Sequence, residues 1–281
     1  MSTTIRTRRG DGWRTALLAV LAVVFLIPIG LVFINSFKSR LYISGAPFAF
    51  PNWETFVGLL NYRTGLTTAG FGAAFGRSVF ITVASVLLIV LCTSMTAWYL
   101  IRVRTRWTQL LYYLFVFSMI VPFQMVMFTM TYVVGQVGLN TVVGIVPVYL
   151  GFGAGLSVFM LAGFVRSIPL EIEEAATIDG CNPLQCFFQV VFPVLRPTAV
   201  TVAILNAMWV WNDYLLPYLV LGTGKKTVPV AIQIAMQGAY GSTDYGGLMA
   251  MLVLAVIPII AFYVAGQKYI VEGVIAGAVK G

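Results

Sequence analysis

Acidic side chains gather in one short stretch of this sequence, PLEIEEAATIDG at residues 169–180. The stretch holds four of the nine carboxylates of the chain, although nearly every neighbouring segment is apolar. Carboxylates on a short helix can pair with basic residues of another protein, and alanine side chains let two backbones approach closely. The stretch therefore predicts a docking helix. Its candidate residues are Glu171, Glu173, Glu174, Ala175, Ala176, Asp179 and Gly180.

The same stretch carries signals for a helix, a sharp bend and a second helix. Pro169 suits a first helical turn, and glutamates near that end favour the positive pole of the helix dipole. Gly180 can take the left-handed conformation that ends a helix, and Asn182 followed by Pro183 is a typical start of the next. We expect the prolines of the following VVFPVLRP to end that second helix. A solvated loop, acidic only for solubility, is the alternative.

The sequence excludes most catalytic and metal chemistry. It contains no histidine, which removes histidine metal sites and Ser-His-Asp or Cys-His nucleophile systems. Cys92, Cys181 and Cys186 form no CxxC pair. GTGKKT at 222–227 lacks the first glycine of a P-loop, and GFGAGL at 151–156 has leucine where a dinucleotide loop needs glycine, so its small residues predict close helix packing. We expect no enzyme activity, metal or cofactor in this chain.

The composition requires lipid as the solvent. Of 281 residues, 60% are hydrophobic and 9% are charged, whereas soluble domains carry about 25% charged residues. Several runs reach the ~20 apolar residues with which a helix crosses ~30 Å of hydrocarbon. The sequence predicts an all-α integral membrane protein of about six transmembrane helices with a cytoplasmic helix-turn-helix loop. The predicted spans are 15–37, 78–101, 110–134, 142–164, 198–221 and 248–268.

Positive charges predict the orientation of the transmembrane domain, 15–270. Arginines gather in the N-terminal tail, 1–14, and in RVRTRW at 102–107, which the positive-inside rule places in the cytoplasm. An even number of spans places the C-terminal tail, 271–281, and the acidic loop, at about 165–197, on the same side. The net charge of +8 is dispersed over short loops, so we expect lipid and no nucleic acid as a partner. A signal peptide is the alternative for the first span, but its apolar region is usually only ~7 to 15 residues long.

A second candidate site surrounds Asp213, the one formal charge well inside a predicted span. Charges at such depth are usually functional. Amide and aromatic neighbours of Asp213 would complete a polar pathway for a transported molecule, whereas the alternative is an acid that braces a neighbouring helix. The candidate pathway residues are Asn206, Trp209, Asn212, Asp213 and, on the third span, Gln124.

Several motifs together resemble a known family. EAATIDG, followed after nine residues by VVFPVLRP, resembles the EAA loop of binding-protein-dependent ABC import permeases, by which the membrane subunit contacts its ATPase. Val190 and Phe192 stand where Ile and Leu are commoner, and both keep the apolar character. NSFK at 35–38, WND at 211–213 and the ending YIVEGVIAGAVKG are similar to the carbohydrate permeases of the maltose-permease-like branch.

The resemblance implies partners and a substrate class. The expected complex contains a second homologous permease in a heterodimer, two ATPase subunits that use ATP and magnesium, and an extracellular or periplasmic sugar-binding protein. It would lie in the cytoplasmic membrane of a bacterium or archaeon and import a sugar, most simply an oligosaccharide. Glu174, Ala175, Ala176 and Gly180 match the coupling loop. The tail residues matched to the ATPase interface are Gly273, Gly277, Ala278, Lys280 and Gly281.

Two other classes of protein remain open alternatives. A secondary transporter or channel without an ATPase would explain the apolar spans but not the coupling motif. Asp213 is a single acid, whereas proton relays use chains of ionisable residues. The second alternative class is an assembly or receptor protein that has a docking loop but no transport pathway.

Overall fold

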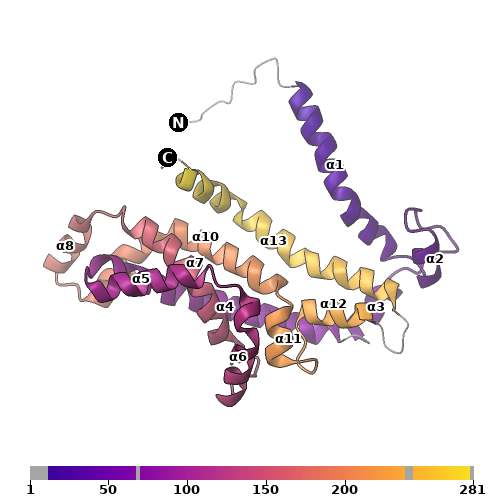
Figure 1. Cartoon of the computed structure of the whole chain (residues 1–281). Helices are drawn as coiled ribbons and strands as arrows, with labels where there is room; N and C mark the ends of the chain where they lie inside the picture. Colours follow the sequence, from indigo (N-terminus) through magenta and orange to yellow (C-terminus); the bar gives the residue numbers. More distant parts are fainter. Residues whose placement is uncertain (1–11, 68–69, 238–242, 279–281) are drawn as a thin grey trace. The chain divides into compact units, whose positions relative to one another are not determined.

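The structure is a computed structural model that describes residues 12–67, 70–237 and 243–278. Every regular element in these ranges is helical (Figure 1). This confirms the all-α prediction. One isolated β-bridge joins Lys38 to Phe56. The elements are α1 (Gly12–Asn35), α2 (Arg40–Gly45), α3 (Leu60–Thr67), α4 (Phe71–Arg102), α5 (Arg106–Ser118), α6 (Phe123–Gln136), α7 (Ile145–Val165), α8 (Leu170–Ile178), α9 (Pro183–Gln185), the π-helix η1 (Cys186–Val191), α10 (Phe192–Asn212), α11 (Leu215–Leu221), α12 (Val228–Gln237) and α13 (Tyr245–Ala278).

The described helices include five that are long and apolar enough to cross a membrane, or six if the bent pair of α5 and α6 counts as one span. This agrees with the prediction of about six transmembrane helices. The five are α1, α4, α7, the continuous run Pro183–Asn212 and the segment Tyr245–Val264 of α13.

The third predicted span, 110–134, differs from a single straight helix. It consists of α5 and α6, which meet at a bend of 107°. Pro122, in extended conformation with ψ of 136°, directly precedes α6. A proline has no N–H to donate to the preceding turn, and it disfavours helical geometry in the residue before it. The helix therefore stops at Ser118 and restarts at Phe123.

The fifth predicted span, 198–221, also differs from the structure at both ends. The helical run begins at Pro183 and continues through η1 into α10, so the prediction that the prolines of VVFPVLRP end the second helix is wrong. Pro193 lies in the first turn of α10 directly after the π-helix, where a shifted hydrogen-bond register accommodates a proline. The run ends at Asn212 because Asp213 is extended, with ψ of 122°.

The chain divides into two compact units, Met1–Phe71 with Ile232–Val256, and Gly72–Ala231 with Ile257–Gly281. In the first unit, the segment after α1 folds back on the end of that helix, and α3 packs against α13. A Cβ atom on Gly65 would lie 3.0 Å from Met251 Cγ, which shows how closely these two helices approach.

The second unit is built around α7, which packs against α4, α5 and α10. Two glycines of the GFGAGL stretch allow this approach, as predicted from their size. A Cβ atom on Gly153 would lie 2.8 Å from Asn206 Oδ1 on α10, and one on Gly155 would lie 2.8 Å from the Phe115 carbonyl oxygen on α5. The helices are therefore too close for larger side chains here.

The short helix α8 covers an apolar cluster that contains Phe187, Val191 and Leu195.

Candidate functional site

The acidic stretch folds as the predicted helix, bend and second helix. Pro169 is extended and directly precedes α8, so it lies one residue outside the helix rather than in its first turn. Gly180 has φ of 88°, the left-handed conformation that side-chain-bearing residues rarely adopt. Asn182 then caps the next helix, its side chain accepting from Gln185 N while the Gln185 side chain accepts from Asn182 N.

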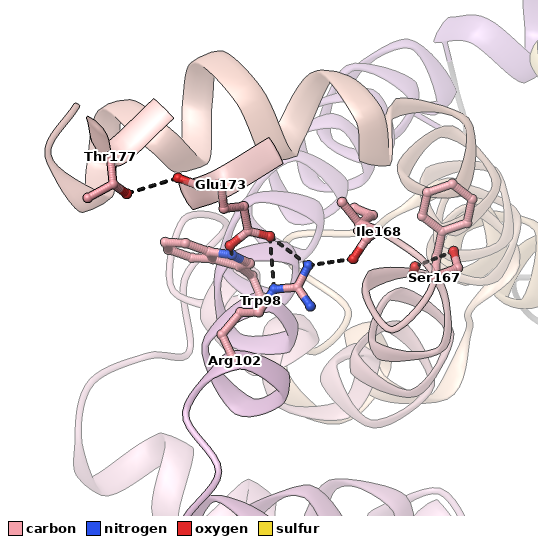
Figure 2. Close-up of polar contacts among 7 residues, drawn as sticks. Trp98, Arg102, Ser167, Ile168, Glu173 and Thr177 are labelled. Carbon is pink, nitrogen blue, oxygen red and sulfur yellow. Dashed lines mark hydrogen bonds and ion pairs between the residues drawn. The ribbon is translucent and has the colours of Figure 1, made fainter. Parts of the chain in front are cut away.

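Glu173 points inward from α8 and joins it to the end of α4 (Figure 2). Its Oε2 accepts a hydrogen bond from Trp98 Nε1 at 2.9 Å. Its Oε1 accepts from Arg102 Nε at 2.8 Å and lies 2.6 Å from Arg102 Nη2. Arg102 Nη2 also donates to the Ile168 carbonyl at 2.9 Å, just before α8. We call Trp98, Arg102, Ile168 and Glu173 the α4–α8 latch.

The latch separates Glu173 from the other carboxylates that the sequence assigned to the docking helix. Glu173 is buried, with Ala176 one turn later on the same face, whereas Glu171, Glu174 and Asp179 are exposed. In a helix of 3.6 residues per turn, residues three or four apart share a face, whereas adjacent residues such as Glu173 and Glu174 point in different directions. Ala176 packs into the apolar cluster below, and Ala175 faces outward. One carboxylate therefore holds the helix in place, and three remain free to meet another molecule.

A hollow of about 600 Å³ opens beside α8. Glu174, Thr177 and Ile178 line it from one helix, and Ile178 is 86% exposed. The remaining lining residues are Trp98, Leu170, Glu173, Cys181, Pro183 and Cys186. A carboxylate beside an exposed apolar side chain and a hollow is a surface suited to a protein partner, because such interfaces combine an apolar centre with polar anchoring groups. The described residues contain no group of three potential metal ligands among His, Cys, Asp and Glu.

The second candidate site lies where α10 ends. Asp213 Oδ2 accepts a hydrogen bond from Tyr149 Oη on α7 at 3.0 Å, and Oδ1 accepts from Leu215 N at 3.0 Å. Trp209 packs edge-on against Tyr149, with ring centroids 5.4 Å apart. The prediction that Asp213 lies inside a spanning helix is therefore wrong. Asp213 lies between α10 and α11, and its carboxylate connects α7 to the start of α11.

The other predicted pathway residues do not gather around Asp213. Asn206 is buried between α7 and α10, donating to Ser157 Oγ at 3.0 Å and to the Val202 carbonyl. Asn212 is exposed and donates to the Met208 carbonyl. Gln124 is an exposed residue in the first turn of α6. A substrate role for any of the five stays a prediction.

The structure describes only some of the C-terminal tail residues that were matched to the ATPase interface. Gly273, Gly277 and Ala278 belong to the last turns of α13. Lys280 and Gly281 lie outside the described residues.

Sequence reasoning missed the residues that hold both sites together. Trp98 and Arg102 lie four residues apart at the end of α4, so they share one helix face, but nothing near them in the sequence points to Glu173. Tyr149 lies in an apolar run, and no neighbouring residue in the sequence indicates that its partner is Asp213. The signal that is present, a tryptophan and an arginine at i and i+4 on a span end, suits a partner carboxylate without identifying it.

Several helices long enough to span a membrane, with a short acidic helix fixed to the end of one of them, define a multi-pass membrane protein. The chain belongs to the family of binding-protein-dependent transport system inner membrane components, which it matches over residues 89–275. The match includes the latch, the helix–bend–helix and the surroundings of Asp213.

Relatives resemble the chain over nearly its whole length. The "Probable starch degradation products transport system permease protein AmyC" of Thermoanaerobacterium thermosulfurigenes is 37% identical over 93% of this chain and 94% of that protein. The multiple sugar-binding transport system permease protein MsmG of Streptococcus mutans is 35% identical over 95% and 96%. The diacetylchitobiose uptake system permease protein NgcG of Streptomyces coelicolor is 32% identical over 94% and 87%.

Solved structures share the fold. A chain of a bacterial ABC transporter involved in the import of the acidic polysaccharide alginate superposes with a TM-score of 0.78 at 22% identity, covering 93% of this chain and 98% of that one. A chain of an alginate ABC transporter in complex with an alginate pentasaccharide-bound periplasmic protein gives 0.62 at 14% identity, covering 92% and 93%.

The brace at Asp213 leads to a prediction about stability. Tyr149→Phe and Asp213→Asn should each lower the stability of the purified protein by about 1 to 3 kcal/mol, because the first leaves the half-buried Asp213 carboxylate and the second the buried Tyr149 hydroxyl with a poorer partner. The two changes should be less than additive, since they remove the same bond. Thermal unfolding in detergent of both single variants and the double variant measures this. If Asp213→Asn alters only the substrate concentration that half-saturates transport, the carboxylate belongs to the pathway instead.

Proposed function

We propose that this chain is a permease subunit of an ATP-driven importer that takes up sugars, with oligosaccharides as the main substrates. The observation that carries this is the likeness, over at least 93% of this chain, to transport permeases whose names specify starch degradation products, multiple sugars and diacetylchitobiose. These relatives differ in the sugar they name, so the likeness supports a class of substrate and not one compound.

The partners follow from the same assignment. A soluble sugar-binding protein delivers the substrate, a second homologous permease completes the pathway, and two ATPase subunits use ATP and magnesium. The family description itself names dependence on a binding protein. The complex lies in the cytoplasmic membrane of a bacterium or archaeon, with both termini and the helix–bend–helix in the cytoplasm.

The acidic helix is the contact with one ATPase subunit. Glu171, Glu174 and Asp179 are exposed, and Glu174 lines the hollow beside α8. The chain continues from α7 through α8 into the helical run of α10, so a displacement of α8 reaches two helices of the bundle directly. The latch gives a third connection, to α4. ATP-driven closure of the ATPases would therefore act on three helices through one short element.

Reconstitution tests the proposed function. The chain would be purified with its partner permease, ATPase and binding protein, and placed in liposomes. We expect labelled oligosaccharides to accumulate when ATP and the binding protein are both present, and not with a non-hydrolysable ATP analogue. Accumulation driven by an ion gradient without ATP would identify a secondary transporter instead.

A further inference from the structure

Exposed aromatic side chains cluster on a loop of the first unit, which we call the aromatic loop and define as residues 46–53. Phe48 is 76% exposed, Phe50 is 78% exposed and Trp53 is fully exposed. The loop follows α2 and precedes α3, shortly after the first span. Several large exposed apolar side chains on one short loop mark a site of contact with another protein or with the membrane.

The aromatic loop is held in a defined conformation at both ends. On one side, the buried Lys38 donates from Nζ to the Ala46 carbonyl at 3.0 Å. On the other, Asn52 Oδ1 accepts from Thr55 N at 3.0 Å, and Thr55 Oγ1 accepts from Asn52 N at 2.8 Å. The β-bridge between Lys38 and Phe56 ties the two ends together. The exposure of the aromatic rings is therefore a property of the fold and not of a loose segment.

One hydrogen bond sets the level of the aromatic loop relative to the first span. Asn35, the last residue of α1, donates from Nδ2 to the Pro47 carbonyl at 2.8 Å. With 24 residues, α1 is about 36 Å long, slightly more than the ~30 Å of hydrocarbon it crosses. The end of α1 therefore reaches the interfacial layer of the bilayer. Phe48, next to Pro47, lies at the same level.

The charge distribution favours lipid over a soluble protein as the covering partner. No charged residue occurs between Arg40 and Glu54, and Lys38 is turned inward. Trp is enriched at the membrane interface, where one part of its ring is apolar and the other can meet water, and Phe is typical of the apolar groups that segments in the interface bury in it. A loop that is aromatic, uncharged and level with the end of a span matches this layer.

We propose that the aromatic loop inserts Phe48, Phe50 and Trp53 into the interfacial layer of the leaflet at the Asn35 end of α1. Lipid headgroups and the first carbons of the acyl chains are the ligand. The insertion anchors the folded segment between α1 and α3 to the membrane surface. The proposal depends on the chain being a membrane protein and not on which solute it transports.

Tryptophan fluorescence of the complete complex in liposomes tests this. The sequence has six tryptophans, so the difference between wild type and Trp53→Phe isolates the signal of Trp53. We expect this difference emission to be blue-shifted, to lose most of its intensity in lipids brominated near the top of the acyl chains, and to resist acrylamide in the water phase. A second reporter, Phe50→Trp in the Trp53→Phe background, should behave in the same way.

Two outcomes would overturn the proposal. Strong quenching by acrylamide with no effect of brominated lipid would place the aromatic loop in water. Protection from both quenchers would mean that another protein covers it, and repeating the measurement without the soluble binding protein would show whether that protein is the cover.

Discussion

Replacing Glu174 with lysine is expected to separate this subunit from its ATPase. Glu174 is exposed and lines the hollow beside α8, so the proposed contact places its carboxylate against a basic group of the partner. Removing one partner of a buried, hydrogen-bonded interface charge pair costs on the order of 2 to 5 kcal/mol, and a reversed charge should do no better. The dissociation constant should rise roughly 30-fold or more, since ~1.4 kcal/mol is tenfold.

The chain offers a matched control on the same helix. Glu171 is also an exposed glutamate of α8, but it does not line the hollow. Glu171→Lys should therefore weaken ATPase binding by only about 0 to 1 kcal/mol, the usual value of an exposed pair. Binding of the purified ATPase to immobilised permease, together with sugar-stimulated ATP hydrolysis, measures both variants. Equal effects of the two substitutions would show that net charge matters and that the hollow is not the contact.

Breaking the α4–α8 latch should release α8 while its exposed carboxylates, Glu171, Glu174 and Asp179, remain in place. Glu173→Ala removes the acceptor shared by Trp98 and Arg102, which leaves a largely buried cation without its partner. Loss of one member of a buried ion pair costs about 3 to 5 kcal/mol. If that free energy appears as local opening, amide hydrogen exchange in α8 should accelerate roughly 100-fold or more.

Hydrogen–deuterium exchange of the intact complex tests the latch peptide by peptide. Exchange should increase in α8 and remain unchanged in the centre of α7, whose packing does not involve Glu173. Glu171→Ala, an exposed carboxylate of the same helix, serves as the control and should leave the exchange of α8 close to wild type. We also expect Glu173→Ala to reduce sugar-stimulated ATP hydrolysis. Unchanged exchange in α8 would mean that the apolar cluster below holds the helix by itself.

The sequence identified the features that depend on a few neighbouring residues. Span-length apolar runs predicted the transmembrane helices, because a helix in lipid must satisfy its own backbone hydrogen bonds and be long enough to cross. Gly180 and Asn182 predicted the bend and the next helix start, because left-handed backbone and side-chain capping act within a turn. The motif of the acidic stretch also indicated the family.

The sequence did not show which prolines end a helix, because that depends on the backbone around each proline. Pro122 divides the third span, whereas Pro193 and Pro197 are accommodated in a continuous helix that includes a π turn. The same residue type thus broke one helix and not another. The difference lies in how each local backbone can re-satisfy the lost hydrogen bond, which the identity of the proline does not specify.

The tertiary structure alone decided which polar groups face inward. Glu173 and Glu174 are adjacent glutamates, yet the first is bound to Trp98 and Arg102, more than 70 residues away, and the second is exposed. Asp213 likewise meets Tyr149 across 64 residues. Local sequence fixes the helical period, and so which residues share a face, but the direction of that face depends on what packs against it. The apolar cluster under Ala176 turns Glu173 inward, and the pairing compensates for removing its charge from water.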